Sequence, residues 1–114
     1  MYLGYRREQR LGSKDIAAIL TSGRRLKGNR LLVQVRENGL DFSRLGLIVP
    51  RRFLPLSVDR NLMKRHVREW FRLRQANLKG RDVLVRLSGP REVAKGLVED
   101  LDQLVVRSIN IVTE

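Results

Sequence analysis

A cluster of basic and amide side chains between residues 60 and 72 is the strongest chemical feature of the sequence. At about 100° per residue, helical spacing brings its members into an arc of about 140°. They are Arg60, Asn61, Lys64, Arg65, Arg68 and Arg72. The opposite half of the same helix carries apolar side chains, namely Leu62, Met63, Val67, Trp70 and Leu73, with Phe71 at its margin. We therefore expect one face to pack in a core and the other to meet negative charge.

The order of charges on the basic face favours a ligand over plain solvation. Exposed helix faces usually alternate in sign, because opposite charges four residues apart attract each other. Here Arg60, Lys64 and Arg68 repeat one sign at that spacing, which is destabilising without a partner. The phosphates of a nucleic acid would remove this repulsion. Asn61 adds a neutral group that can contact a base edge or a 2′-hydroxyl.

The whole chain is strongly basic, and its charge is unevenly distributed. Its 114 residues carry a formal net charge of +12, and an apolar content of 42% is ordinary for one globular domain. Residues 1–36 hold nine Lys and Arg against two acidic residues, and residues 51–74 hold eight against two. Residues 75–114 hold six of each sign. We therefore expect a polyanionic partner, bound by the first two-thirds of the chain.

Other kinds of site find little support. The sequence has no cysteine, and its only histidine, His66, falls in the apolar arc, where packing is expected. Glu99, Asp100 and Asp102 could form a carboxylate cluster for Mg²⁺-dependent hydrolysis, but a solvated helix face is the preferred interpretation. No signal-peptide core or membrane-length apolar run occurs, so we expect a cytoplasmic protein without a membrane partner.

The rest of the chain must hold the basic helix in place. Residues 1–12 are expected to be a basic flexible arm, and residues 13–114 a single α+β domain. Ser13 is a suitable N-cap for a first helix that Gly23 would end. A basic loop over residues 24–28 is expected to follow.

Strands and two further helices complete the predicted domain. Residues 30–36 and 44–49 are predicted to form an antiparallel pair, because Asn38 and Gly39 between them are typical of a turn. Ser57 would then cap the basic helix. A third strand over residues 82–87 and a last helix beginning at Pro90 follow in the sequence. This order predicts a two-layer sandwich, a small mixed sheet with helices packed on it.

Several segments in order resemble the protein subunit of bacterial ribonuclease P. They are the stretches Arg44 to Arg52, Val58 to Arg65 and Arg68 to Arg72. The similarity extends to residues 15–23 and 80–85, and it covers roughly residues 10–107. The resemblance implies that family's α-β-β-β-α-β-α sandwich, a fold shared with a ribosomal protein domain, with a left-handed β-α-β crossover.

The resemblance also implies a function. The chain would be the RNA-binding subunit of an endoribonuclease, assisting a catalytic RNA that removes the 5′ leader from precursor tRNA. Mg²⁺ would be held mainly by the catalytic RNA, with no cofactor on the protein and no small-molecule substrate. Its partners would be the catalytic RNA and the leader of precursor tRNA.

Site residues follow from matching positions in the family. Arg51 and Arg52 match a basic pair before the helix, and Ile16, Leu20 and Gln34 match positions that line the leader cleft. The RNA-binding set on the helix is Arg60, Asn61, Lys64, Arg65 and Arg68, with Arg72 added from its helical spacing. No residue of the chain is expected to be catalytic.

Some positions depart from the family pattern. Leu62 stands where arginine is usual, and Ile16 and Leu20 stand where aromatic side chains are frequent. Two other functions remain open on the sequence alone. One is a ribosome-associated or general RNA-binding module without a processing role. The other is a self-sufficient Mg²⁺ nuclease that uses Asp102.

Overall fold

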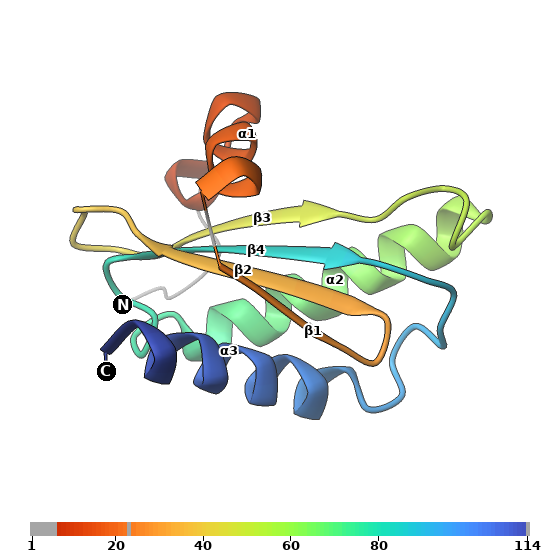
Figure 1. The fold of residues 1–114 in the computed structure, drawn as a ribbon. Helices are drawn as coiled ribbons and strands as arrows, with labels where there is room; N and C mark the ends of the chain where they lie inside the picture. Colours follow the sequence, from red (N-terminus) through yellow and green to blue (C-terminus); the bar gives the residue numbers. More distant parts are fainter. Residues whose placement is uncertain (1–6, 23, 114) are drawn as a thin grey trace.

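The structure, a computed structural model, describes residues 7–22 and 24–113 and consists of one sheet with helices on both faces (Figure 1). Its elements are η1 (Arg7–Gln9), α1 (Ser13–Ser22), β1 (Arg24–Gly28), β2 (Leu31–Glu37), β3 (Arg44–Ile48), α2 (Ser57–Arg74), β4 (Arg81–Leu87) and α3 (Leu97–Thr113). Helices α2 and α3 cover one face, and α1 covers part of the other. The predicted α-β-β-β-α-β-α order is therefore confirmed.

The sheet has the strand order β1-β2-β4-β3. β2 is antiparallel to both β1 and β4, whereas β3 and β4 are parallel and are connected through α2. The predicted pairing of residues 30–36 with residues 44–49 is wrong, because β4 lies between these strands. Most side chains of β4 are buried, and such a strand needs a neighbour on each edge.

The predicted basic loop over residues 24–28 is also wrong, since these residues form strand β1. β1 lies at the edge of the sheet, where exposed charged side chains such as those of Arg25 and Lys27 are tolerated. The side chains of Leu31, Val33 and Val35 on β2 are buried beneath the sheet, as their alternation predicted. The larger core thus lies between the sheet and the pair α2 and α3.

α2 packs on this core through Met63, Val67, Trp70 and Phe71, all predicted from its periodicity. Leu73 was expected on the same side but is 63% exposed. The buried side chains of α2 lie on the side of the helix that carries Phe71, and Leu73 lies outside this buried stripe, facing solvent. The apolar half of α2 is therefore narrower than the sequence pattern indicated.

Two helix starts differ from the predictions. Ser57 is the first residue of α2 and does not cap it, because Leu56 occupies the N-cap position without a side-chain hydrogen bond. The last helix begins at Leu97 and not at Pro90. Gly96 has a φ of 69°, which interrupts a helix, and Arg91 donates hydrogen bonds to backbone carbonyls of the preceding loop.

Residues 7–12 are packed onto the domain, whereas residues 1–6 and Gly23 lie outside the described residues. Gln9 and Leu11 are buried, and the N–H of Leu11 donates a 3.0 Å hydrogen bond to the carbonyl of Leu45 on β3. Residues 7–12, which were expected to belong to a flexible arm, thus have their own contacts with the sheet.

Candidate nucleic-acid interface

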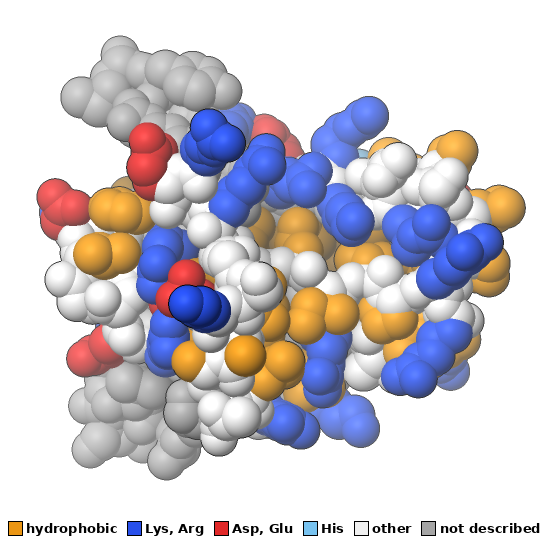
Figure 2. Space-filling view, turned by 90° about the horizontal axis from the view of Figure 1, so that it is seen from above, with side chains coloured by type: hydrophobic (Ala, Val, Ile, Leu, Met, Phe, Trp, Pro, Cys, Tyr) orange, Lys and Arg blue, Asp and Glu red, His pale blue; other side chains and the backbone are white. Residues whose placement is uncertain are grey.

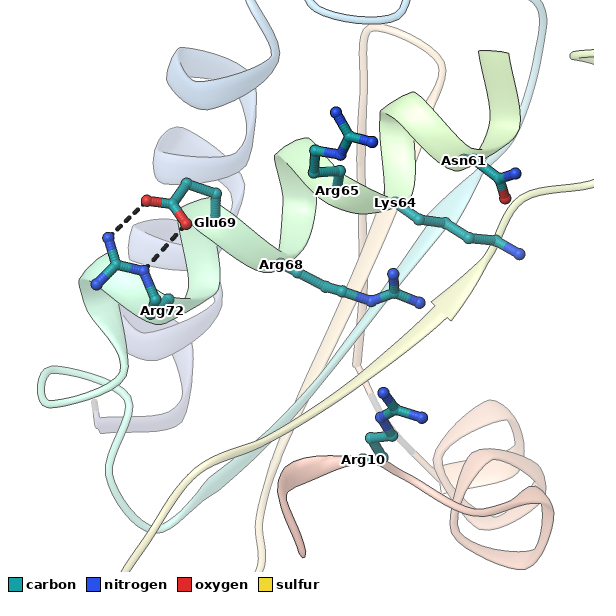
Figure 3. A pocket seen from close by; sticks show the side chains of 7 residues that line it. All are labelled: Arg10, Asn61, Lys64, Arg65, Arg68, Glu69 and Arg72. Carbon is teal, nitrogen blue, oxygen red and sulfur yellow. Dashed lines mark hydrogen bonds and ion pairs between the residues drawn. The ribbon is translucent and has the colours of Figure 1, made fainter. Parts of the chain in front are cut away.

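The solvent-facing side of α2 forms one wall of a basic groove of about 660 Å³. Its lining residues are Arg10, Asn61, Lys64, Arg65, Arg68, Glu69 and Arg72 (Figure 3). The buried apolar side chains of α2 hold the helix on the core, and its basic side chains therefore face the groove. Five of the residues predicted from the sequence to bind RNA are thus brought together in one surface.

Three cations of the groove are available to a ligand. Within residues 7–22 and 24–113, the side chains of Lys64, Arg65 and Arg68 form no hydrogen bond or ion pair. Lys64 and Arg68 repeat positive charge four residues apart, so their repulsion is not relieved inside the protein. The groove is therefore suited to binding a run of phosphates.

Arg72 is held differently from these three residues. Its guanidinium donates hydrogen bonds of 2.6 and 3.0 Å to the carboxylate of Glu69, one turn earlier on α2. These hydrogen bonds lower the pKa of Glu69 below its ordinary value. Glu69 consequently remains an anion and offsets the charge of Arg72 at one end of the groove.

Arg60 does not line the groove, although it was predicted to belong to the same basic face. Its Nη1 donates hydrogen bonds to the carbonyl oxygens of Leu54 at 2.9 Å and Pro55 at 2.8 Å. The side chain thus turns back toward the loop before α2 and fastens it. Helical spacing did not predict these contacts of Arg60, because it gives the direction in which a side chain leaves the helix and not the position of its guanidinium group.

Arg51 and Arg52 lie in the turn after β3, away from the α2 groove. The guanidinium carbon of Arg52 lies 4.7 Å from the ring centre of Phe53, which is cation–π distance. Arg52 lines a separate pocket of about 350 Å³ together with Arg86 and Ser88, at the ends of β3 and β4. The predicted RNA-binding residues therefore divide between two surfaces.

The predicted leader-cleft residues meet where α1 packs on the sheet. Ile16 and Leu20 are half-buried against a small cluster formed by Leu11, Ile19 and Leu84. Gln34 is only 2% exposed, and its Nε2 donates a 3.0 Å hydrogen bond to the carbonyl of Ile19. Ile16 and Leu20 thus keep some accessible surface, while the amide of Gln34 is used to attach α1 to β2.

Charged groups fix α1 over the sheet as well. Asp15 of α1 lies 3.5 Å from both Arg36 and Arg44, which flank the fully buried Asp82 of β4. Burial acts to raise the pKa of Asp82, but hydrogen bonds from Arg44, Asn38 and Arg36 bring it below its ordinary value. The result is an ionised carboxylate under α1, neutralised by two arginines.

The open part of this sheet face is also basic. Figure 2 shows Lys and Arg side chains spread over it among hydrophobic ones, with most acidic side chains toward one end. Lys27 of β1 and Arg86 of β4 stand on either side of the β2 position Leu32 in the strand register. A single-stranded polyanion could therefore follow the sheet beside α1.

The carboxylates of the last third do not fit a metal site. Asp102 accepts hydrogen bonds from the indole N–H of Trp70 at 2.8 Å and from Arg74 at 2.9 Å. Asp100 accepts hydrogen bonds from Asn29 and Arg91. Both side chains keep part of their surface exposed, as predicted, but they also cross-link the fold, which the sequence pattern did not predict. Among the described residues, no three of His, Asp and Glu come together to hold a metal ion.

Within residues 7–22 and 24–113, no helix has the length and apolar character needed to cross a bilayer.

Comparisons with known proteins agree with this arrangement. A sequence model of the family Ribonuclease P matches residues 5–108. The ribonuclease P protein component of Chromobacterium violaceum is 43% identical over 83 residues, which cover 72% of this chain and 69% of the relative. That of Nitrosococcus oceani is 43% identical over 76 residues, which cover 67% of this chain and 63% of the relative. The matched regions thus span about two-thirds of the relatives' own lengths.

A solved structure supports the same relationship in three dimensions. The ribonuclease P protein of Thermotoga maritima superposes on 90% of this chain and 93% of its own with a TM-score of 0.59 and 34% identity.

Proposed function

The chain belongs to the ribonuclease P protein family, and we propose that it serves as the RNA-binding subunit of that ribonucleoprotein in tRNA 5′ maturation. The alternative of a ribosomal or general RNA-binding module finds no support in the comparisons. Because catalytic RNA and precursor tRNA meet in the bacterial cytoplasm, the proposal includes a cytoplasmic location.

The α2 groove is the proposed contact with the catalytic RNA. The observation that carries this assignment is the set of Lys64, Arg65 and Arg68, three clustered cations with no intramolecular partner among the described residues. Each would neutralise a backbone phosphate and release counterions, which favours association at low salt. Asn61 would add a neutral contact to a sugar or a base.

The junction of α1 with the sheet is the proposed path of the precursor leader. Ile16 and Leu20 would supply apolar contacts to unstacked bases, and Lys27 and Arg86 would lie near the backbone. Gln34 is proposed to hold α1 in position and not to touch the leader, since it is buried. Aliphatic contacts replace aromatic stacking here, so we expect leader affinity to depend mainly on charge.

The hydrolytic chemistry is proposed to reside on the RNA. The described carboxylates are either bound to arginines or too dispersed to hold Mg²⁺, so no catalytic step is assigned to this chain. Mg²⁺ would be bound by the RNA, where it can stabilise charge during phosphodiester hydrolysis. The protein would contribute affinity and neutralise repulsion where the two RNAs approach.

Reconstitution with the cognate catalytic RNA tests this proposal. Adding the protein should raise precursor-tRNA cleavage at low Mg²⁺, and Arg68→Ala should weaken that effect. Protein that leaves cleavage by the RNA unchanged would refute the role.

The leader path can be tested separately by comparing binding of precursor tRNA and mature tRNA to the holoenzyme. Leu20→Ala should reduce the preference for the precursor, whereas Leu73→Ala, an exposed leucine on α2, should not. Equal effects of the two substitutions would contradict a leader contact at α1.

A further inference from the structure

We infer that Arg10 is a phosphate-binding residue of the α2 groove, supplied by the N-terminal segment from across β3. This inference rests on the proposed function, because it adds a residue to the surface assigned to the catalytic RNA. Arg10 was not among the residues predicted from sequence, since it lies 47 positions before Ser57, the first residue of the helix with which it shares the groove.

The backbone around Arg10 is held against the outer edge of β3. Arg10 forms a parallel β-bridge with Leu45, and the N–H of Leu11 donates to the carbonyl of Leu45. The one-turn helix η1 precedes the bridge, and the N–H of Arg10 donates a hydrogen bond to the carbonyl of Arg7 at its end. The position of the Arg10 backbone is therefore fixed by the sheet.

The two neighbours of Arg10 are buried anchors. Gln9 is 5% exposed, and its Nε2 donates hydrogen bonds to the carbonyl of Ser43 at 3.2 Å and to Oε1 of Gln75 at 2.7 Å. Leu11 packs over Gly46, where an added Cβ would lie only 3.0 Å from the leucine side chain. Arg10 itself is exposed between these two buried residues. Its side chain therefore leaves the anchored segment on the solvent side.

That outward direction leads into the groove. Figure 3 shows the Arg10 side chain reaching from the N-terminal segment toward α2, with the side chain of Arg68 extending into the space between them and Lys64 lining the same groove. The groove thus has cations on two walls that are far apart in the sequence. A nucleic-acid backbone seated between them would meet positive charge from both sides, and a guanidinium on a fixed segment loses less freedom on binding.

Arg7 provides a natural contrast to Arg10. It is an exposed arginine on the same segment, but it does not line the groove. A general effect of N-terminal positive charge would make the two residues equivalent. A specific contact in the groove would make Arg10 more important.

The test measures the affinity of the full-length protein for its cognate catalytic RNA over a range of salt concentrations. Arg10→Ala should weaken binding several-fold and reduce the slope of log affinity against log salt by about one unit. Arg10→Lys should keep the slope, because it keeps the charge. Arg7→Ala should leave the slope nearly unchanged. Unfolding curves of each variant would verify that the fold is retained.

The outcomes separate this inference from the function on which it rests. A reduced slope for Arg68→Ala with an unchanged slope for Arg10→Ala would overturn the role of Arg10 and leave the proposed interface intact. Equal losses for Arg7→Ala and Arg10→Ala would also overturn it. Wild-type protein that does not bind the catalytic RNA would refute both proposals.

Discussion

The guanidinium of Arg44 donates two hydrogen bonds of 2.8 Å to the carboxylate of Asp82, across the parallel pair of β3 and β4. Arg36 donates a further 3.0 Å hydrogen bond to the same carboxylate from β2. Three neighbouring strands are thus joined at one level by a buried anion and two cations. Asp15 approaches both arginines from α1, so this group also connects the first helix to the sheet.

Replacing Asp82 should cost much of the protein's stability. Asp82→Asn removes the anion but leaves two partly buried arginines without it, and loss of one partner in a buried ion pair typically costs about 3–5 kcal/mol. Urea unfolding followed by circular dichroism would measure the change. Asp41→Asn, in the exposed turn after β2, is the matched control and should change stability little.

Stability should also fall in acid because of Asp82. Its folded pKa is lowered, so its contribution is complete above the unfolded pKa of about 3.9 and is lost as the pH falls through the lower folded pKa. The urea midpoint of the wild type should therefore drop below about pH 4. In Asp82→Asn the same drop should be smaller, and an identical pH profile for the two proteins would contradict the assignment.

Replacing Arg60 should mainly affect stability, whereas replacing Arg68 should mainly affect RNA binding. Arg60→Ala removes two hydrogen bonds to loop carbonyls, so it should lower stability by about 1–3 kcal/mol with a small change in the salt dependence of RNA binding. Arg68→Ala should reduce the salt slope by about one unit with little change in stability. Parallel unfolding and RNA-binding measurements would distinguish them. A larger salt effect for Arg60 would place it on the RNA surface after all.

Removing Glu69 should strengthen RNA binding. Glu69→Gln takes an anion out of the groove and releases the guanidinium of Arg72 from its ion pair. We expect affinity for the catalytic RNA to rise roughly threefold to tenfold, with a steeper salt dependence. Glu99→Gln, an exposed carboxylate on α3, removes the same charge elsewhere and serves as the control. Equal gains from both variants would indicate only a general charge effect.

The basic helix was predictable from sequence because its signal is local. Buried Met63, Val67 and Trp70 recur at helical spacing, and Lys64, Arg65 and Arg68 occupy the other side. The hydrogen-bond partners of the individual arginine side chains were not predictable in this way. Arg60 and Arg72 have partners within one or two turns, and long flexible side chains choose among several such partners.

Strand order was harder to predict, because the deciding strand lies late in the chain. The turn residues after β2 favoured a hairpin with β3, and no local pattern indicated that β4 would enter between them. Arg10 escaped prediction for a related reason. Its position depends on the contacts of Gln9 and Leu11 with residues far along the chain, and one apolar residue in a basic segment is a weak signal.

The central position of β4 has a consequence for synthesis of the protein. β4 ends at Leu87, and β3 pairs with no other strand of the described sheet. During translation, β3 and the basic helix α2 therefore leave the ribosome before the strand that joins them to β1 and β2 has been made. Closing the sheet is a late and non-local step, of the kind that slows folding. A nascent chain that ends before residue 81 would carry the RNA-binding charges without the scaffold that arranges them.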